Sequence, residues 1–315
     1  MFTTSVTDEC LRSNYLIGAL REVSPHRDFV EYASKNAPKF PNETQRFPES
    51  PIYCRPQGYV HLNEGSRLDH KTYHLLEMVQ RLTNAFYMEN GARSHGVPSS
   101  STTTESWNDS DESVSSLRDK IFAIRPAADG DFIGGLHARY QFESIRLTSL
   151  VYAHAMANKI PFSKAAAQLG GICPLNIRQE QPKSISMQIR DALIRTDTSF
   201  CWGRSIGIMF WVTLIAGAAA NPGPLAHENR VGEEEDVRKW LAAVAVRCCV
   251  MLHFQYGSSI METLRRVVAV ETVLAQARNR DDGFVDASSA SLAVNIGSEA
   301  AWPPIFGPEQ TPLMH

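Results

Sequence analysis

The sequence predicts an all-α protein, an irregular helical bundle around a buried central apolar helix, with long proline-rich and serine-rich loops. Three observations predict this class. The run Ile206–Ala220 is apolar on every side, so it needs other helices around it. Leucine, valine and isoleucine recur at three- and four-residue steps in several further segments. No β-hairpin signal and no alternation of strands with helices competes with this pattern.

Helical spacing of apolar residues predicts three helices in the N-terminal part, residues 1–92. Thr7 or Asp8 is expected to cap the first helix, and Pro25 to end it. Asn90, followed by glycine, supplies a stop for the third helix. The three predicted helices run from about Leu11 to Val23, from Asp28 to about Ser34 and from Ser66 to Asn90.

Two stretches between the helices are predicted to lack regular structure. Residues 37–56 are rich in proline, which excludes a regular helix and favours either an extended connection along the surface or a disordered one. Residues 93–116 form a low-complexity loop of serine, threonine and acidic residues, which bury too little apolar surface to become ordered. The prolines of the first stretch are Pro38, Pro41, Pro48, Pro51 and Pro56.

Residues 117–279 are predicted to form a helical core, and residues 280–315 a loop-like tail. Ser163 and Ser184 are expected to cap two short helices, and Asn221 with the proline after it ends the central apolar run. The predicted helices of the core are Leu136–Asn158, Ser163–Leu169, Ser184–Arg195, Ile206–Ala220, Val237–Phe254 and Ser258 to about Arg278.

Length and composition exclude several classes of protein. With 315 residues, 43% of them hydrophobic, the chain can bury a sizeable core. The net charge of -3 comes from 31 basic and 34 acidic residues, and no basic stripe stands out, which argues against DNA binding by this chain alone. The central run is shorter than the roughly 20 apolar residues of a membrane-spanning helix. No membrane partner is therefore expected.

The six cysteines show no spacing typical of a zinc site. We interpret them as buried thiols of a reducing compartment. In keeping with such a compartment, the N-terminus lacks the basic start and the apolar stretch of a secretory signal. The six cysteines are Cys10, Cys54, Cys173, Cys201, Cys248 and Cys249. Cys248 and Cys249 follow Arg247, which favours a lowered thiol pKa, but adjacent side chains of a helix point about 100° apart, so no redox pair is predicted.

His70, His74 and Glu77 would lie on one side of a helix and could hold a metal ion. Without an H-E-x-x-H arrangement or further ligands, the polar face of an amphipathic helix is the favoured interpretation. No metal, cofactor-binding or catalytic residue is therefore predicted.

Motifs for phosphate binding and nucleophilic catalysis are also missing. Gly203 and Gly207 lack the strand and the lysine of a phosphate-binding loop. The segment Tyr256–Ser259 fits a helix break with a serine cap better than a catalytic serine. Acidic residues of the loops lack the spacing that an enzyme acting on a metal-bound diphosphate would need; they are Asp109, Asp111, Glu112, Asp281 and Asp282.

Several single residues have both a structural and a functional interpretation. Glu143 and Arg146, three positions apart, are expected to form a solvated pair, or, if buried, to join neighbouring helix ends. His253 is expected to pack within its helix. Trp202, Trp211 and Trp240 are expected in the core, although they could line a cavity.

Three segments together resemble the C-terminal regulatory region of fungal-specific transcription factors. Glu143–Tyr152 is similar to the family's Glu-x-x-Arg-apolar helix that ends in tyrosine. Gly207–Ala219 is similar to the apolar helix that carries a tryptophan and ends in small residues. Arg238–Leu241 is similar to the basic and aromatic step that begins the next helix. The resemblance covers roughly residues 136–275, and its motifs are packing patterns.

The resemblance implies a nuclear, non-enzymatic regulator that acts through protein partners or a second copy, or through a small-molecule effector. Nothing in the chain resembles the six-cysteine zinc cluster that usually precedes this region, so DNA contact is expected only indirectly. The alternatives are an all-α biosynthetic enzyme with a site near Trp202, Arg204 and Glu143, and a non-catalytic helical scaffold.

Overall fold

The computed structural model describes residues 6–35, 47–54, 58, 59, 62, 68–90, 112–127, 135–170, 183–196, 202–221 and 228–282. Within these ranges the regular elements are helices and there is no strand, which confirms the predicted all-α class. The helices are α1 (Val6–Arg21), α2 (Arg27–Lys35), α3 (His70–Glu89), α4 (Val114–Phe122), α5 (Leu136–Asn158), α6 (Phe162–Leu169), α7 (Ile185–Ile194), η1 (Gly203–Ser205), α8 (Ile206–Ala219) and α9 (Glu228–Asp282).

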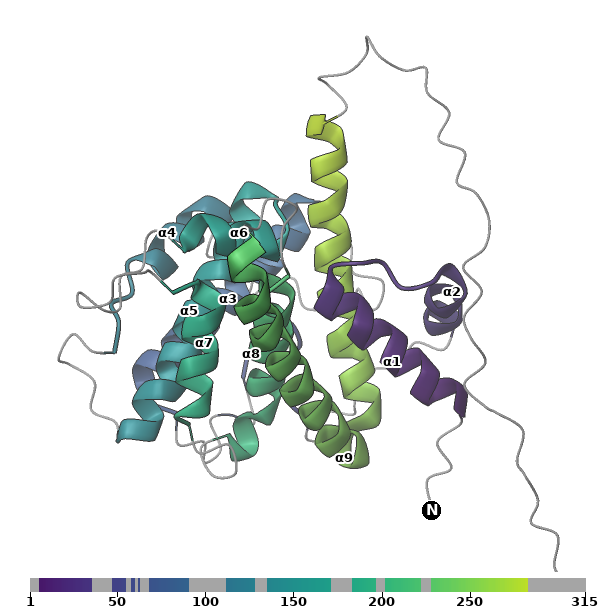
Figure 1. The fold of residues 1–315 in the computed structure, drawn as a ribbon, viewed down its shortest axis with the longest axis horizontal. Coiled ribbons are helices and arrows are strands. Elements are labelled where there is room, and N and C mark those ends of the chain that lie inside the picture. Colours follow the sequence, from purple (N-terminus) through teal and green to yellow (C-terminus); the bar gives the residue numbers. More distant parts are fainter. Residues whose placement is uncertain are drawn as a thin grey trace, which may run out of the picture.

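Helix α8 lies at the centre of the fold. All its residues after Ile206 are buried, and it contacts α1, α5, α6, α7 and α9. Figure 1 shows the first half of α9 crossing α8. Helices α5, α6 and α7 lie on one side of this crossing, and α1 lies on the other. Because the apolar run is enclosed by amphipathic helices, its side chains join one continuous core that extends from Leu11 to Leu274.

Two glycines of α8 allow other backbone and side chains to come very close. A Cβ atom on Gly207 would lie 2.6 Å from the carbonyl oxygen of Glu49 and 2.7 Å from that of Pro48. A Cβ atom on Gly217 would lie 2.5 Å from Cδ2 of Leu20 in α1. The segment before α3 therefore packs against the beginning of α8, and helix α1 packs against its end.

The C-terminal part of the proline-rich stretch is buried, so the expectation of a surface connection is wrong for residues 47–53. Phe47 packs against Tyr53, with ring centroids 4.9 Å apart. Arg266 of α9 lies over the Tyr53 ring at 5.0 Å and donates a hydrogen bond of 3.1 Å to the carbonyl oxygen of Ile52. The segment therefore acts as a plug between α8 and α9. Residues 37–46 lie outside the described ranges.

Helix α9 is longer than the two helices predicted in its place. It is bent at Tyr256, whose φ of -142° and ψ of 41° are not helical, so the predicted helix break is confirmed. Figure 1 shows the two halves forming a hairpin, with the end of the second half projecting beyond the bundle. The acidic patch Glu233–Asp236 lies inside the first half rather than before it.

Other boundaries were predicted with mixed success. Helix α5 has the predicted bounds, and Ser184 caps α7 by accepting a hydrogen bond of 3.3 Å from the Met187 amide. The low-complexity loop ends earlier than predicted, because Ser113 accepts a hydrogen bond of 3.2 Å from the Ser116 amide and thereby caps α4. Residues 93–111 and the tail after residue 282 lie outside the described ranges.

Two predicted caps are wrong. Helix α1 begins at Val6, so Thr7 and Asp8 lie within it. Ser163 lies inside α6, which follows Pro161. The group that accepts hydrogen bonds from the first amides of α6 is the carboxylate of Glu22, the residue after α1. None of the helices in the described ranges is long and apolar enough to cross a membrane.

Candidate functional site

The Glu143–Arg146 pair lies in the buried middle of α5, so the expectation of a solvated pair is wrong and the buried alternative applies. Nε and Nη2 of Arg146 donate to the two carboxylate oxygens of Glu143 at 3.0 and 2.6 Å. Glu143 also accepts a hydrogen bond of 3.3 Å from the Ala127 amide, and Arg139 donates one of 3.2 Å to the Ala127 carbonyl. The pair therefore joins α5 to the segment that follows α4.

The other two residues of the possible enzyme site have different surroundings. Trp202 is fully buried, and its indole N–H donates a hydrogen bond of 2.9 Å to Oγ1 of Thr196. Arg204, two residues further on, is exposed. Since Glu143 is held by Arg146 and Trp202 by Thr196, both side chains have structural partners.

Thr196 offers a test of this structural role. Replacement of Thr196 by valine is expected to lower the free energy of unfolding by about 1–3 kcal/mol, because it leaves the buried Trp202 N–H without an acceptor. Urea denaturation followed by tryptophan fluorescence measures the change. Thr196→Ser keeps the hydroxyl and should lose much less. An unchanged stability of Thr196→Val would show that the hydrogen bond to Trp202 contributes nothing.

The remaining tryptophans follow the expectation of core packing to different degrees. Trp211 is fully buried, 5.5 Å from the ring of Tyr152, which also stacks on Phe162 at 5.8 Å. The Tyr152 hydroxyl makes a hydrogen bond of 3.1 Å with Thr83, and burial raises the pKa of Tyr152 well above its ordinary value. Trp240 is half-buried. The aromatic cluster thus joins α3, α5, α6 and α8.

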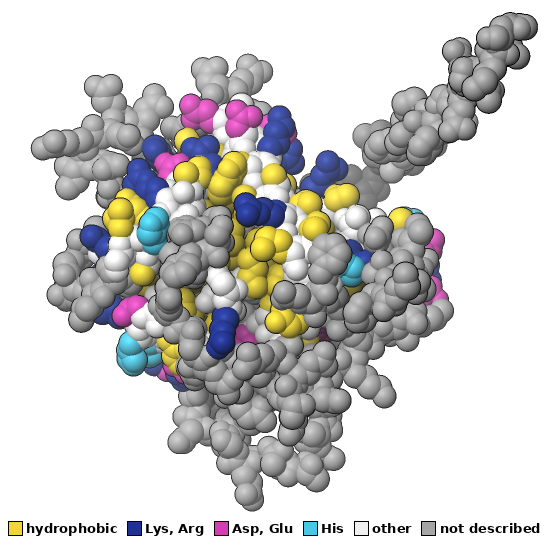
Figure 2. Space-filling model, turned by 90° about the horizontal axis from the view of Figure 1, so that it is seen from below, with side chains coloured by type: hydrophobic (Ala, Val, Ile, Leu, Met, Phe, Trp, Pro, Cys, Tyr) yellow, Lys and Arg dark blue, Asp and Glu magenta, His cyan; other side chains and the backbone are white. Residues whose placement is uncertain are grey.

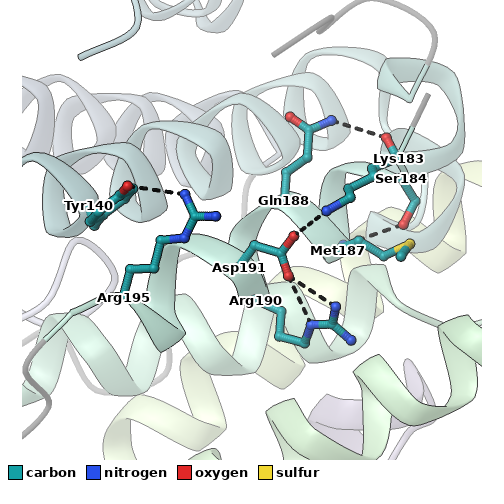
Figure 3. Close-up of polar contacts among 8 residues, drawn as sticks. All are labelled: Tyr140, Lys183, Ser184, Met187, Gln188, Arg190, Asp191 and Arg195. Carbon is teal, nitrogen blue, oxygen red and sulfur yellow. Dashed lines mark hydrogen bonds and ion pairs between the residues drawn. The ribbon is translucent and has the colours of Figure 1, made fainter. Parts of the chain in front are cut away.

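Polar side chains in and beside α7 contact one another and Tyr140 of α5 (Figure 3). Asp191 accepts a hydrogen bond of 2.8 Å from Lys183 and bonds of 3.3 and 3.0 Å from Arg190. Burial favours the neutral acid, but these cations together lower the pKa of Asp191. Arg195 donates a hydrogen bond of 3.0 Å to the Tyr140 hydroxyl and lies over that ring at 5.2 Å. The set ties the end of α7 to α5.

Among the described cysteines, Cys10 differs from the other three in its exposure. Cys248 and Cys249 are buried and Cys54 half-buried, but Cys10 is exposed, so the expectation of buried thiols is wrong for Cys10. Burial raises the pKa of the Cys248 thiol to about 12, despite the nearby Arg247. His253 contacts the guanidinium of Arg12 in α1. The two other cysteines lie outside the described ranges.

The residues considered for metal binding lie on the solvent side of α3. His70 and His74 are exposed, and His74 approaches Glu77 at 4.0 Å. Within the described ranges no three His, Cys, Asp or Glu side chains gather closely enough to hold a metal ion. Glu112, from the acidic loop, pairs with Arg81 and Lys120. Asp109 and Asp111 lie outside these ranges.

Large apolar side chains reach the surface on the first half of α9. Val246, Val250 and Met251 are 46%, 52% and 52% exposed. Val246 and Val250 are one helical turn apart and lie on the same side of the helix, whereas Met251 points about 100° away from Val250. Figure 2 shows that hydrophobic side chains also gather in the middle of the face seen from below, with Lys and Arg among them. We call Val246 and Val250 the α9 stripe.

Sequence reasoning missed two carboxyl groups, the half-buried Glu22 and the buried Glu271. Glu22 follows α1, and its carboxylate accepts hydrogen bonds from the amides of Phe162 and Ser163 at the start of α6. Glu271 lies on the buried face of α9, and a signal for it was present, because Val267 and Leu274 flank it at helical spacing on the apolar face. No comparable signal connects Glu22 with residues about 140 positions further along the chain.

Comparison with protein-family models, with curated proteins and with solved structures gives no match for this chain.

Proposed function

We propose that this chain is a nuclear regulatory protein of the fungal-specific transcription-factor type, which acts through protein contacts and binds DNA only indirectly. The observation that supports the proposal is the arrangement of the three resembling segments. They lie in α5, α8 and the first half of α9, and α8 contacts both of the other helices. Segments far apart in the sequence thus form one packed unit, as expected if they were parts of a single regulatory domain.

The surroundings of the candidate catalytic residues also favour a regulator over an enzyme. The carboxylate of Glu143 is bound by Arg146 and by the Ala127 amide, so its oxygens are occupied by structural partners. The helix at the centre, α8, contains no ionisable side chain. A site for acid–base chemistry would instead bring titratable groups together in a polar cleft.

The α9 stripe supports a role in protein contacts, which a non-catalytic scaffold would share. Apolar side chains on a surface helix lose contact with water when a partner covers them. A regulator and a scaffold differ in whether recruitment of the chain to a promoter changes transcription.

The experiment that tests the proposal fuses the full chain to an unrelated sequence-specific DNA-binding domain and measures a reporter gene in fungal cells. We expect reporter expression to change at least several-fold relative to the DNA-binding domain alone. The double variant Val246→Glu with Val250→Glu should remove most of this change, since it places two charges on the stripe. An unchanged reporter with the wild-type fusion contradicts the regulatory function and favours the scaffold.

Two controls complete the test. Met88→Glu changes an 84% exposed side chain of α3 and should leave the reporter response intact. The isolated chain should show no sequence-specific DNA binding across a range of salt concentrations, in keeping with its net charge of -3. Tight sequence-specific binding would contradict the proposal of indirect DNA contact.

A further inference from the structure

Glu271, in the second half of α9, is a carboxyl group buried without a partner. Its residue is 8% exposed, and neither of its carboxylate oxygens has a hydrogen-bond partner among the described residues. Its neighbours on the same helix face, Val267, Val268 and Leu274, are buried apolar residues. An ionised carboxylate is strongly disfavoured in such surroundings, because it loses its hydration and gains nothing in return.

A second carboxyl group, Glu22, lies at the junction of α1, α6 and α8. Glu22 has a φ of 53°, and the Val23 amide donates a hydrogen bond of 3.1 Å to the Gly18 carbonyl, which closes the end of α1. This conformation directs the carboxylate to the first amides of α6, those of Phe162 and Ser163, and to the Ser163 hydroxyl. Glu22 therefore caps α6 across the bundle.

The end of α8 completes this junction. The side-chain amide of Asn221 donates a hydrogen bond of 3.1 Å to the Leu20 carbonyl and also bonds to the Glu22 carboxylate. Burial raises the pKa of Glu22, while the donors of Ser163, Phe162 and Asn221 oppose this by stabilising the ionised form. With its oxygens facing N–H and O–H groups, Glu22 is the member of the pair that can carry the charge.

The charge of Glu22 acts directly on Glu271. Burial raises the pKa of Glu271 well above its ordinary value, and repulsion from Glu22 raises it further. Among the described residues, no cation forms a hydrogen bond with the Glu271 carboxylate. Helix α8 has no ionisable side chain, the buried Arg12 of α1 contacts His253, and Arg21 at the end of α1 is exposed. Arg190 of α7 and Lys183, just before α7, are paired with Asp191. On α9 itself Arg265 and Arg266 pair with Glu262.

We infer that Glu271 is a proton-binding site on the buried face of α9, and that loss of its proton loosens the junction of α1, α6 and α8 around Glu22. Two carboxyl groups that repel each other would then both be ionised, Glu271 in apolar surroundings and the half-buried Glu22 among hydrogen-bond donors. The contact that gives way is the one between Glu22 and α6, since Glu22 belongs to a loop and Glu271 to the middle of a long helix. This inference is independent of the proposed regulatory function.

The direction of the pH dependence follows from the raised pKa of Glu271 in the folded state. Glu271 contributes its full stabilisation at pH values below about 4.3, the pKa of this side chain in the unfolded chain. This stabilisation is lost as the pH rises towards the raised pKa of Glu271 in the folded protein. Over that window the unfolding equilibrium constant rises up to about tenfold per pH unit, because the unfolded chain releases one more proton.

The test compares wild type with Glu271→Gln by urea denaturation between pH 5 and pH 9. The wild type should lose stability as the pH rises, and Glu271→Gln should remove up to about one proton from this dependence. Glu233→Gln, at an exposed position of the same helix, should behave as the wild type does. Equal pH dependence in wild type and Glu271→Gln would overturn the inference.

A local measurement separates loosening of the junction from global unfolding. Hydrogen exchange at the Phe162 and Ser163 amides should become faster with pH in the wild type than intrinsic exchange chemistry requires, and not in Glu271→Gln. Glu271→Leu should match Glu271→Gln, because both remove the ionisable group. Amide protection at α6 that follows the same pH course in all three proteins would contradict loosening.

Discussion

Replacement of Arg146 by methionine is expected to lower the free energy of unfolding by about 3–5 kcal/mol, or to prevent folding altogether. The side chains of Arg146 and Glu143 are only 5% and 11% exposed, so removal of the guanidinium leaves a carboxylate buried in α5 with the Ala127 amide as its remaining partner. Urea denaturation followed by circular dichroism measures the loss. The cost comes from the stranded charge rather than from the attraction of the pair.

The double variant Glu143→Leu with Arg146→Met separates these two causes. It removes both charges and keeps a similar volume, so most of the lost stability should return, except for the hydrogen bond to Ala127. A loss below about 1 kcal/mol for Arg146→Met alone would mean that the pair behaves as a solvated contact.

Replacement of Gly207 by alanine is expected to lower the free energy of unfolding by about 3 kcal/mol or more. The new methyl group would overlap the backbone of Pro48 and Glu49, at 2.6–2.7 Å, where no side-chain rotation can make room. The plug formed by residues 47–53 would have to move away from α8, and its buried side chains would become exposed. Urea denaturation measures the change in stability.

Gly203→Ala is the matched control for this variant. Gly203 lies four residues earlier, is exposed, and has no atom within 4 Å of the position of an added Cβ. The control should change stability by no more than about 0.5 kcal/mol. Similar losses in the two variants would refute the close approach at Gly207. Gly207→Ser should be at least as destabilising as Gly207→Ala, since it adds volume at the same point.

The positions of the helices could largely be predicted from the sequence because each amphipathic helix repeats its apolar residues at a fixed spacing. Helix α5 has the predicted bounds, and the break at Tyr256 was expected. Helix α4 was missed because its N-cap, Ser113, belongs to a serine-rich stretch where a capping residue looks like any other serine. Short helices with few apolar residues give too weak a periodic signal.

The surroundings of the polar residues could not be predicted because their partners are distant in the sequence. Glu143 and Arg146 give the same three-residue spacing whether they are solvated or buried, and only the packing of α4, α7 and α8 around α5 decides between the two. The burial of residues 47–53, in the proline-rich stretch, could not be predicted for a similar reason. Proline excludes a helix at Pro48 and Pro51, but burial of these residues depends on the space left at Gly207.

The contacts of α1 with residues far along the chain bear on how the protein folds during synthesis. Arg12 meets His253 after a separation of 241 positions, and the Leu20 carbonyl meets Asn221 after 201. Helix α1 is therefore made long before α8 and α9, which cover its apolar side. Closure of such long loops slows folding, so the apolar side of α1 stays exposed until α8 and α9 have been made.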